Sequence, residues 1–221
     1  VYAFGLRALL VIAVSIAAAC AAEYAMGRLF SKNTLSDGSA FLTGLLVGFN
    51  MPAQVPLFIA VLASVFAIVI VKWSFGGLGA NWMNPALAGR VFVFFSWTGG
   101  MTKWSMPKMV TDTVSGASPL GFVKTGMTGF EGSVSGPMGF LAEQGYPAGS
   151  YMDLFIGRIP GCIGEVSALL LLAGGIFLII LKIANWEIPV FYLGSFALLT
   201  WIFGGLGYGS GFFTGDVLFH L

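Results

Sequence analysis

Charged residues are scarce in this 221-residue chain: Lys, Arg, Asp and Glu together make up 9% of it, whereas hydrophobic residues make up 57%. A soluble domain carries about 25% charged residues, so this chain lacks the means to cover a water-facing surface. The net charge of +1 gives no reason to expect a nucleic-acid partner, because phosphate binding needs a concentrated basic face. The composition predicts an all-α integral membrane protein, since apolar helices satisfy their own backbone groups in lipid.

Cysteine and histidine are equally rare. Cys20 and Cys162 are the only cysteines, and both lie in apolar runs, where a free thiol packs as a small hydrophobic group. No Cys/His cluster is present for zinc or an iron–sulfur centre, and the single histidine, His220, cannot form a pair of haem ligands. Walker loops, Rossmann fingerprints and nucleophile–base pairs are also missing from the sequence. We therefore expect no metal site and no catalytic residue.

Long apolar runs are what the chain does have. A spanning helix needs about 20 mostly apolar residues, and four runs meet this requirement: 5–27, 54–72, 161–182 and 188–206. Arg28 and Lys32 follow the first run as expected interfacial anchors, and the second run ends at Lys72 and Trp73.

Two further apolar runs are broken. Residues 37–51 are too few for one crossing, and residues 76–97 contain four glycines, a proline, two asparagines and an arginine. Discontinuous helices of this kind are typical of transport and ion-coupling sites, although a helix kinked by its glycines is the alternative. The closing "TGDVLFHL" echoes "SDGSAFLTGL". We expect a polytopic helical bundle with half helices and an internal repeat, truncated at both ends.

A long polar interruption separates two groups of spans, which divides the chain into residues 1–98, 99–150 and 151–221. The middle part is expected to be an extramembrane loop, and it holds DTVSGASPL at residues 112–120. Ser and Gly favour ordinary turns, so a simple turn is one interpretation. The other is a modification site, because Gly and Ala leave a serine hydroxyl uncovered and a hydroxyl can carry a phosphoester.

Four of the charged residues within or beside the apolar segments are candidates for a role. Glu165 has two interpretations. A carboxylate within the membrane suggests an ion or proton path, whereas a carboxylate at a helix N-terminus is stabilised by the helix dipole. Arg90 could pair with a buried acid or bind an anion. Asp37 and Asp216 open short helices as N-caps, with an ion ligand as the alternative.

Taken in order, four motifs resemble one family. They are "DGSAFLTGLLVGFNMP", "FGGLGANWMNPALAGRVF", "DTVSGASPL" and "PGCIGEVSALLLLAGGIFL", and they resemble the RnfD/NqrB family of membrane subunits from ion-pumping redox complexes. The phrases "DLFIGRIPGCIGEVSALLLL" and "WEIPVFYLGSFALL" are more similar to RnfD, the member found in the Rnf ion-translocating ferredoxin:NAD oxidoreductase complex, than to NqrB of the quinone reductase.

The resemblance implies a covalent flavin. In the family, the last residue of an S-G-A-T motif carries FMN through a phosphoester bond, which a flavin transferase makes from FAD. The matching acceptor is Ser118, where serine replaces the family's threonine. Asp112, Ser115, Gly116 and Ala117 complete the recognition motif. A second, non-covalent flavin is left open.

The resemblance further implies a subunit that relays electrons between ferredoxin and NAD while Na⁺ or H⁺ crosses the membrane, with no turnover by this chain alone. Its partners would be a second covalent-flavin subunit, iron–sulfur membrane and soluble subunits, and the flavin transferase during maturation. The location implied is the cytoplasmic membrane, with the flavin loop on the outer face. The hypothetical ion path is lined by Glu165, Asn81, Asn84 and Asp37.

Three alternatives stay open: the NqrB-type subunit of a Na⁺-translocating NADH:quinone reductase, a flavin-free channel or transporter for a small solute, and a scaffold whose flavin site has decayed.

Overall fold

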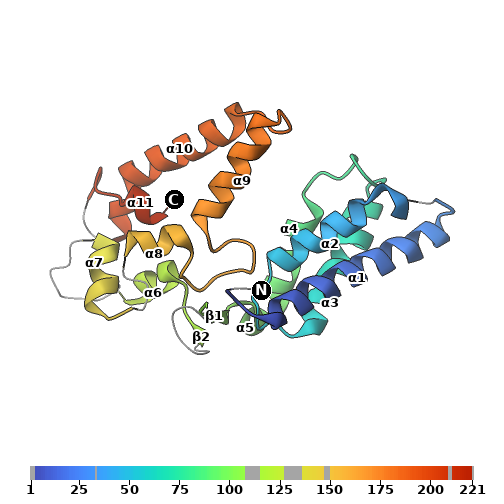
Figure 1. Cartoon of the computed structure of the whole chain (residues 1–221), viewed down its shortest axis with the longest axis horizontal. Coiled ribbons are helices and arrows are strands. Elements are labelled where there is room, and N and C mark those ends of the chain that lie inside the picture. Colours follow the sequence, from blue (N-terminus) through green and yellow to red (C-terminus); the bar gives the residue numbers. More distant parts are fainter. Residues whose placement is uncertain are drawn as a thin grey trace. The chain divides into compact units, whose positions relative to one another are not determined.

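The computed structural model describes residues 3–32, 34–107, 115–126, 136–146, 150–208 and 211–220 (Figure 1). The chain divides into two compact units. Unit 1 comprises Val1–Gly116 and Pro160–Glu165, and unit 2 comprises Ala117–Ile159 and Val166–Leu221. Most described residues are helical, which agrees with the expected α class, apart from one short pair of strands.

Unit 1 is built from one long helix and several shorter ones. Its elements are α1 (Leu6–Leu29), the 3₁₀ turn η1 (Leu35–Asp37), α2 (Ser39–Phe49), α3 (Leu57–Phe66), the π-helical segment η2 (Ala67–Trp73), α4 (Pro85–Ser96), α5 (Thr98–Met101), β1 (Trp104–Ser105) and β2 (Ser115–Gly116). The two broken runs therefore form the short helices α2 and α4. The short length of the first run, and the glycines and proline of the second, predicted these breaks.

Glycines let α2 lie directly against α1. A Cβ added at Gly44 would lie 2.6 Å from Ile16 Cα, and one added at Gly48 would lie 2.9 Å from Ile12 Cα. Small residues four positions apart allow such close backbone approach in membrane helices. The resulting core joins α1, α2, α3 and α4, and its fully buried members include Val11, Val47, Met51, Ile59, Ala63 and Val93.

Residues 160–165 belong to unit 1, although the sequence predicted that they begin a helix spanning 161–182. That prediction was wrong at its start, because α9 covers only Ala168–Ile180, with Ser167 as its N-cap. The backbone N–H of Gly164 donates to Phe49 O at 2.9 Å, and that of Ile163 donates to Met51 O at 3.1 Å. The segment thus supplies partners to carbonyl groups at the end of α2 that lack partners within the helix.

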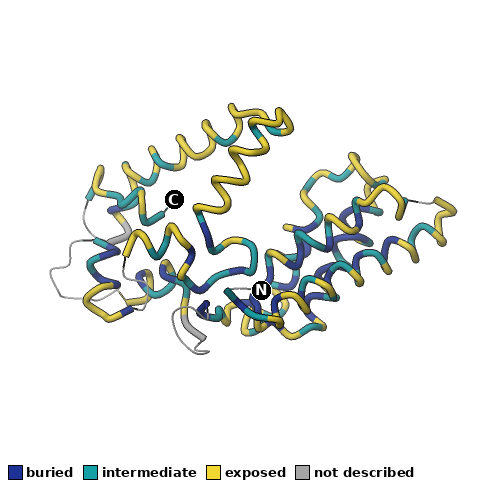
Figure 2. Tube along the Cα trace, viewed as in Figure 1, coloured by how far each residue is buried: buried dark blue, intermediate teal, exposed yellow. Residues whose placement is uncertain are grey.

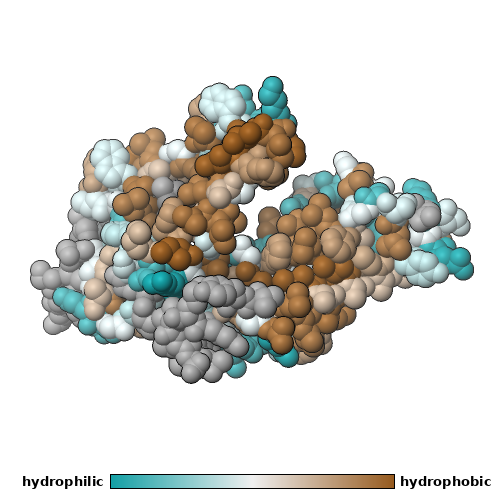
Figure 3. Space-filling view, viewed as in Figure 1, coloured by the Kyte–Doolittle hydropathy of each residue, from teal (hydrophilic) through white to brown (hydrophobic). Residues whose placement is uncertain are grey.

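Unit 2 contains α6 (Pro119–Gly126), α7 (Gly136–Glu143), α8 (Tyr151–Ile156), α9, α10 (Glu187–Phe203), the 3₁₀ turn η3 (Gly204–Tyr208) and α11 (Val217–His220). No residue of α9 or α10 is buried (Figure 2). Both helices are strongly apolar, and hydrophobic side chains gather over this unit in Figure 3.

Among the described residues, two helices combine the length and the hydropathy needed to cross a bilayer, Leu6–Leu29 and Glu187–Leu206. These match two of the four predicted spans, 5–27 and 188–206. Four shorter apolar helices accompany them: Ser39–Phe49, Leu57–Trp73, Pro85–Ser96 and Ala168–Ile180.

Candidate functional site

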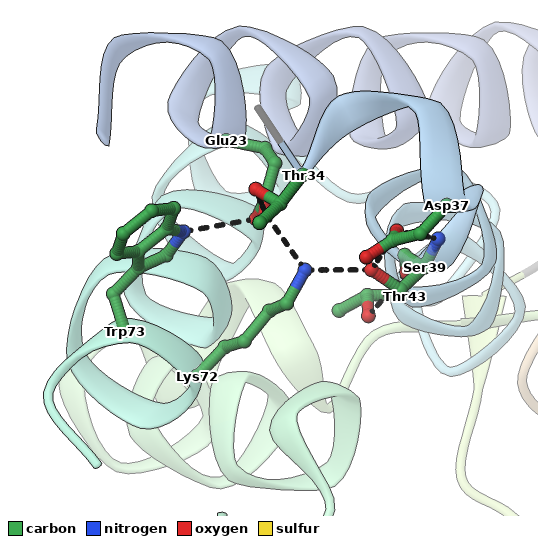
Figure 4. Close-up of polar contacts among 7 residues, drawn as sticks. All are labelled: Glu23, Thr34, Asp37, Ser39, Thr43, Lys72 and Trp73. Carbon is green, nitrogen blue, oxygen red and sulfur yellow. Dashed lines mark hydrogen bonds and ion pairs between the residues drawn. The ribbon is translucent and has the colours of Figure 1, made fainter. Parts of the chain in front are cut away.

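A buried ion pair links α1 to the end of η2 in unit 1. Lys72 Nζ lies 2.8 Å from Glu23 Oε1, and the exposed fractions of the two side chains are 3% and 0%. Trp73 Nε1–H donates to the other carboxylate oxygen at 3.1 Å, and the Thr34 hydroxyl donates to Oε1 (Figure 4). Moving two charges out of water costs free energy. Three hydrogen-bond donors to the Glu23 carboxylate, from Lys72, Trp73 and Thr34, offset part of that cost.

The pair continues as a chain of hydrogen bonds toward the surface. Lys72 Nζ also donates to Ser39 Oγ at 2.6 Å, and that hydroxyl donates to Asp37 Oδ1 at 2.5 Å (Figure 4). The Ser39 N–H donates to the same oxygen at 2.8 Å. These bonds from Ser39, led by its hydroxyl, hold the pKa of Asp37 below its usual value because they stabilise the carboxylate form. The prediction that Asp37 is an N-cap was wrong, because Gly38 is the N-cap of α2; Asp37 lies one residue earlier, binds the first N–H of the helix and ends the polar chain.

The π-helical turn brings Lys72 and Trp73 to Glu23. A π-helix widens the backbone and often occurs at functional sites. The Trp73 ring stacks on Phe30, with centroids 5.4 Å apart and planes 21° apart. A cavity of about 400 Å³ opens beside Glu23, lined among others by Arg28, Lys32 and Thr34. Lys72, which the sequence placed simply at the end of a span, is therefore an internal residue.

A second ion pair lies where α2, α4 and residues 160–165 meet. Arg90 Nη1 is 3.0 Å from Glu165 Oε1 and donates to Asn50 Oδ1 at 2.8 Å, while its Nη2 donates to Cys162 Sγ at 3.2 Å. Arg90 therefore pairs with an acid, but not with a buried one as the sequence suggested. Glu165 lies before the cap of α9, and 46% of its side chain is exposed. One guanidinium thus holds the short helices and the connecting segment together.

The two asparagines predicted for the ion path lie in the approach to α4. Asn84 Oδ1 accepts from the N–H groups of Ala86 and Leu87 at 2.9 and 3.3 Å, which makes Asn84 the N-cap of α4. Asn81 Nδ2 donates to Met83 O at 3.3 Å, and its Oδ1 is buried with no partner among the described atoms. Each of the four predicted ion-path residues hydrogen-bonds to groups outside this set, and no hydrogen bond joins two of them among the described residues.

The predicted flavin motif falls partly outside the described residues, because Asp112 lies in 108–114. Ser115 and Gly116 form β2, whose backbone pairs antiparallel with Ser105 and Trp104 of β1. This strand pair lies within residues 99–150, the part predicted from the sequence to be an extramembrane loop.

Ser118 stands at the start of α6. Its Oγ accepts from the Gly121 N–H at 3.2 Å, and its carbonyl accepts from the Phe122 N–H at 2.8 Å. These two bonds make Ser118 the N-cap of the helix, with Pro119 in the first helical position, where its missing N–H costs nothing. Ser118 is half-buried as a residue, and its neighbour Ala117 is exposed.

Sequence reasoning missed Glu23. The signal was available, since Glu23 is an acid in an otherwise apolar predicted span and Lys72 ends another. Its pairing depends on two residues 49 positions apart. In the described part of the chain, no three His, Cys, Asp or Glu side chains gather as a metal site.

Long apolar helices, short half helices and buried charged groups together define a class of helical membrane protein. The chain belongs to the NQR2, RnfD, RnfE family, whose model matches residues 1–221.

Three relatives illustrate the similarity. The chain is 41% identical to the D subunit of the proton-translocating ferredoxin:NAD(+) oxidoreductase complex of Clostridium ljungdahlii over all of its own length. It is 44% identical, over 92% of its length, to the D subunit of the Na(+)-translocating ferredoxin:NAD(+) oxidoreductase complex of Acetobacterium woodii. It is 39% identical, over 71% of its length, to the B subunit of the Na(+)-translocating NADH-quinone reductase of Neisseria meningitidis. The chain spans 64% and 59% of the lengths of the first two relatives and 36% of the third.

Proposed function

We propose that this chain is the flavin-carrying membrane subunit of an Rnf-type complex, which relays electrons between ferredoxin and NAD and couples them to Na⁺ or H⁺ translocation. The observation that carries this proposal is the similarity to the D subunits of two ferredoxin:NAD(+) oxidoreductase complexes over 92–100% of the chain. The quinone-reductase relative matches only 71% of the chain at somewhat lower identity, which makes it the second candidate.

Ser118 is the proposed attachment point for FMN. The hydroxyl is a primary alcohol at the N-terminus of α6, where free backbone N–H groups and the helix dipole favour a negatively charged phosphate. The flavin transferase would recognise the rest of the motif, which consists of Asp112, Ser115, Gly116 and Ala117. A bound FMN would supply the redox chemistry, while the protein supplies its placement.

In the membrane, the proposed arrangement is polytopic. The exposed apolar surfaces of α9 and α10 support contact with lipid or with other subunits, and the cytoplasmic membrane with an outer flavin loop is the location that the resemblance implies. The proposed internal repeat rests on the sequence echo alone, since Asp216 Oδ1 accepts from the N–H three residues on, at 3.0 Å, and Asp37 Oδ1 from the N–H two residues on.

The proposed ion path uses polar groups of unit 1. The sequence suggests four residues for this path: Glu165, Asn81, Asn84 and Asp37. A chain of hydrogen bonds that starts at Asp37 adds Ser39, Lys72 and Glu23 to the set. A charged side chain inside the membrane costs free energy and usually has a function, which supports a role for these polar residues in ion transport.

The proposed partners are the other components of such a complex, since the names of the relatives describe complexes of several subunits. They would be a second covalent-flavin subunit, iron–sulfur membrane and soluble subunits, and the flavin transferase during maturation.

The flavin proposal is tested on the purified complex. We expect ultraviolet-excited fluorescence on this chain after denaturing electrophoresis, and peptide mass spectrometry should find the FMN adduct on Ser118. Ser118→Ala should abolish the fluorescence, and Ser118→Thr should retain it because threonine keeps the hydroxyl. Ser150→Ala is the matched control, since Ser150 caps α8 through Met152 N–H and a lost cap costs about 1 kcal/mol at either site. An unmodified Ser118 peptide, from complexes whose partner subunit is fully flavinylated, would refute the proposal.

A further inference from the structure

A small aromatic core in unit 2 packs against α6, the helix that begins just after the proposed flavin acceptor. The ring of Phe122 on α6 lies 5.1 Å from that of Tyr146 and 6.0 Å from that of Phe140 on α7. Val123 and Leu141 between these helices are fully buried. Side chains in such a core occupy defined rotamers, so α6 has a fixed position on α7.

Tyr146 connects this core to the residue before the acceptor. Its hydroxyl donates to Ala117 O at 2.8 Å, across 29 residues of sequence, and only 9% of the residue is exposed. Burial raises the pKa of Tyr146 to about 12, so the phenol remains protonated and continues to donate at neutral pH. The backbone on the N-terminal side of Ser118 is therefore anchored by one hydrogen bond from a residue three positions beyond the end of α7.

The same tyrosine contacts the other side of the acceptor. Its ring packs on Phe122, whose N–H holds Ser118 O, while the Gly121 N–H holds Ser118 Oγ at 3.2 Å. Ser118 is thus bracketed between Ala117 and Phe122, two residues that Tyr146 touches. Holding a reacting group in one orientation is a large source of rate.

Gly121 has a separate role at the hydroxyl. A Cβ added there would lie 3.1 Å from Ser118 Oγ, closer than a methyl group normally approaches oxygen. Gly121 is not among the glycines with positive φ, so its backbone does not need glycine, and alanine is the better helix former. What the glycine provides at this position is open space beside Oγ.

We propose that Tyr146 and Gly121 are positioning residues for the flavinylation of Ser118: Tyr146 anchors the acceptor backbone and Gly121 leaves Oγ accessible to the incoming phosphorus. The inference rests on the proposed function. In the transfer, a bond forms between Ser118 Oγ and the FMN phosphorus of FAD, the bond from that phosphorus to the bridging oxygen breaks, AMP leaves, and the hydroxyl proton passes to solvent.

The test measures the rate of flavin incorporation. Complex from cells lacking the transferase is incubated with purified transferase, FAD and Mg²⁺, and covalent fluorescence of this chain is followed on denaturing gels. Tyr146→Phe retains the ring and removes the hydroxyl, and we expect it to slow the initial rate about 2- to 10-fold, the effect of one lost hydrogen bond. Gly121→Ala should slow it by a similar factor while leaving the melting temperature of the complex unchanged or higher.

For Gly121→Ala we expect slower flavin incorporation without a lower melting temperature. Structural damage would instead lower both the rate of flavin incorporation and the melting temperature, so the two causes are distinguishable. Tyr151→Phe is the control for the phenol, since Tyr151 donates to Asp216 Oδ2 at 2.5 Å in the same unit. Gly174→Ala is the control for the glycine, because an added Cβ there meets nothing within 4 Å. Both controls should load at the unsubstituted rate.

Outcomes for the two proposals are distinct. If the unsubstituted chain takes up no flavin, the proposed function fails. If it is loaded, and Tyr146→Phe and Gly121→Ala load equally fast, the positioning inference is overturned. A control variant that slows loading as much as its partner would overturn it too.

Discussion

Breaking the buried pair between Glu23 and Lys72 should strongly destabilise unit 1. Glu23→Gln leaves an ammonium group in a site where the lysine side chain is 3% exposed. Removing one partner of a buried pair typically costs about 3–5 kcal/mol, because the remaining charge is uncompensated. In a chain of this size, about 2–4 °C of melting temperature corresponds to 1 kcal/mol. We therefore expect the melting temperature to fall by about 6–20 °C.

The assay is thermal unfolding of the purified protein in detergent for Glu23→Gln, Lys72→Met and the double variant. The double variant removes both charges, so its loss should fall short of the sum of the single losses by about 0.5–3 kcal/mol, the range for contacting residues. Asp153→Asn is the control, because Arg158 and Asp153 form an exposed pair at 3.4 Å with side-chain exposures of 49% and 24%. Such a pair contributes about 0–1 kcal/mol. Additive single losses, or a Glu23→Gln loss no larger than that of the control, would refute the reasoning.

Two other predictions concern packing and ion transport. Gly44→Ala should cost about 1–3 kcal/mol by overpacking, since its Cβ would lie 2.6 Å from Ile16 Cα; detergent melting curves should show the loss, and a result equal to that of Gly174→Ala would contradict it. Glu165→Gln should reduce ion pumping by the assembled complex in liposomes if Glu165 belongs to the ion path, whereas unchanged pumping would limit Glu165 to holding Arg90.

Several parts of the fold were predictable because their causes are local. The span 5–27 appears as α1 and 188–206 as most of α10, since a long apolar run determines a helix by length and composition. The glycines and proline of 76–97 indicated a broken run, of which residues 85–96 form a helix, but Asn84 was assigned to the ion path and not to the N-cap that it forms. In each case, residues close together in the sequence determine where the helix begins and ends.

The start of α9 was mispredicted for a tertiary reason. Residues 161–166 are apolar enough to read as helix, but Ile163 and Gly164 donate instead to Met51 and Phe49, more than 100 residues earlier. An added Cβ at Gly164 would lie 2.7 Å from Phe49 Cβ, so the close approach also requires glycine.

The sequence by itself determined the α-helical class and the breaks in the apolar runs, because composition and local backbone chemistry suffice for these, whereas the proposed flavin motif came only from the resemblance to a family. Only the tertiary structure decided which charges meet: Glu23 with Lys72 across 49 residues, and Arg90 with Glu165 across 75. It also decided that Tyr146 reaches Ala117 beside the acceptor. Such pairings depend on how helices pack over long sequence separations, and packing is set by the whole unit rather than by any one segment.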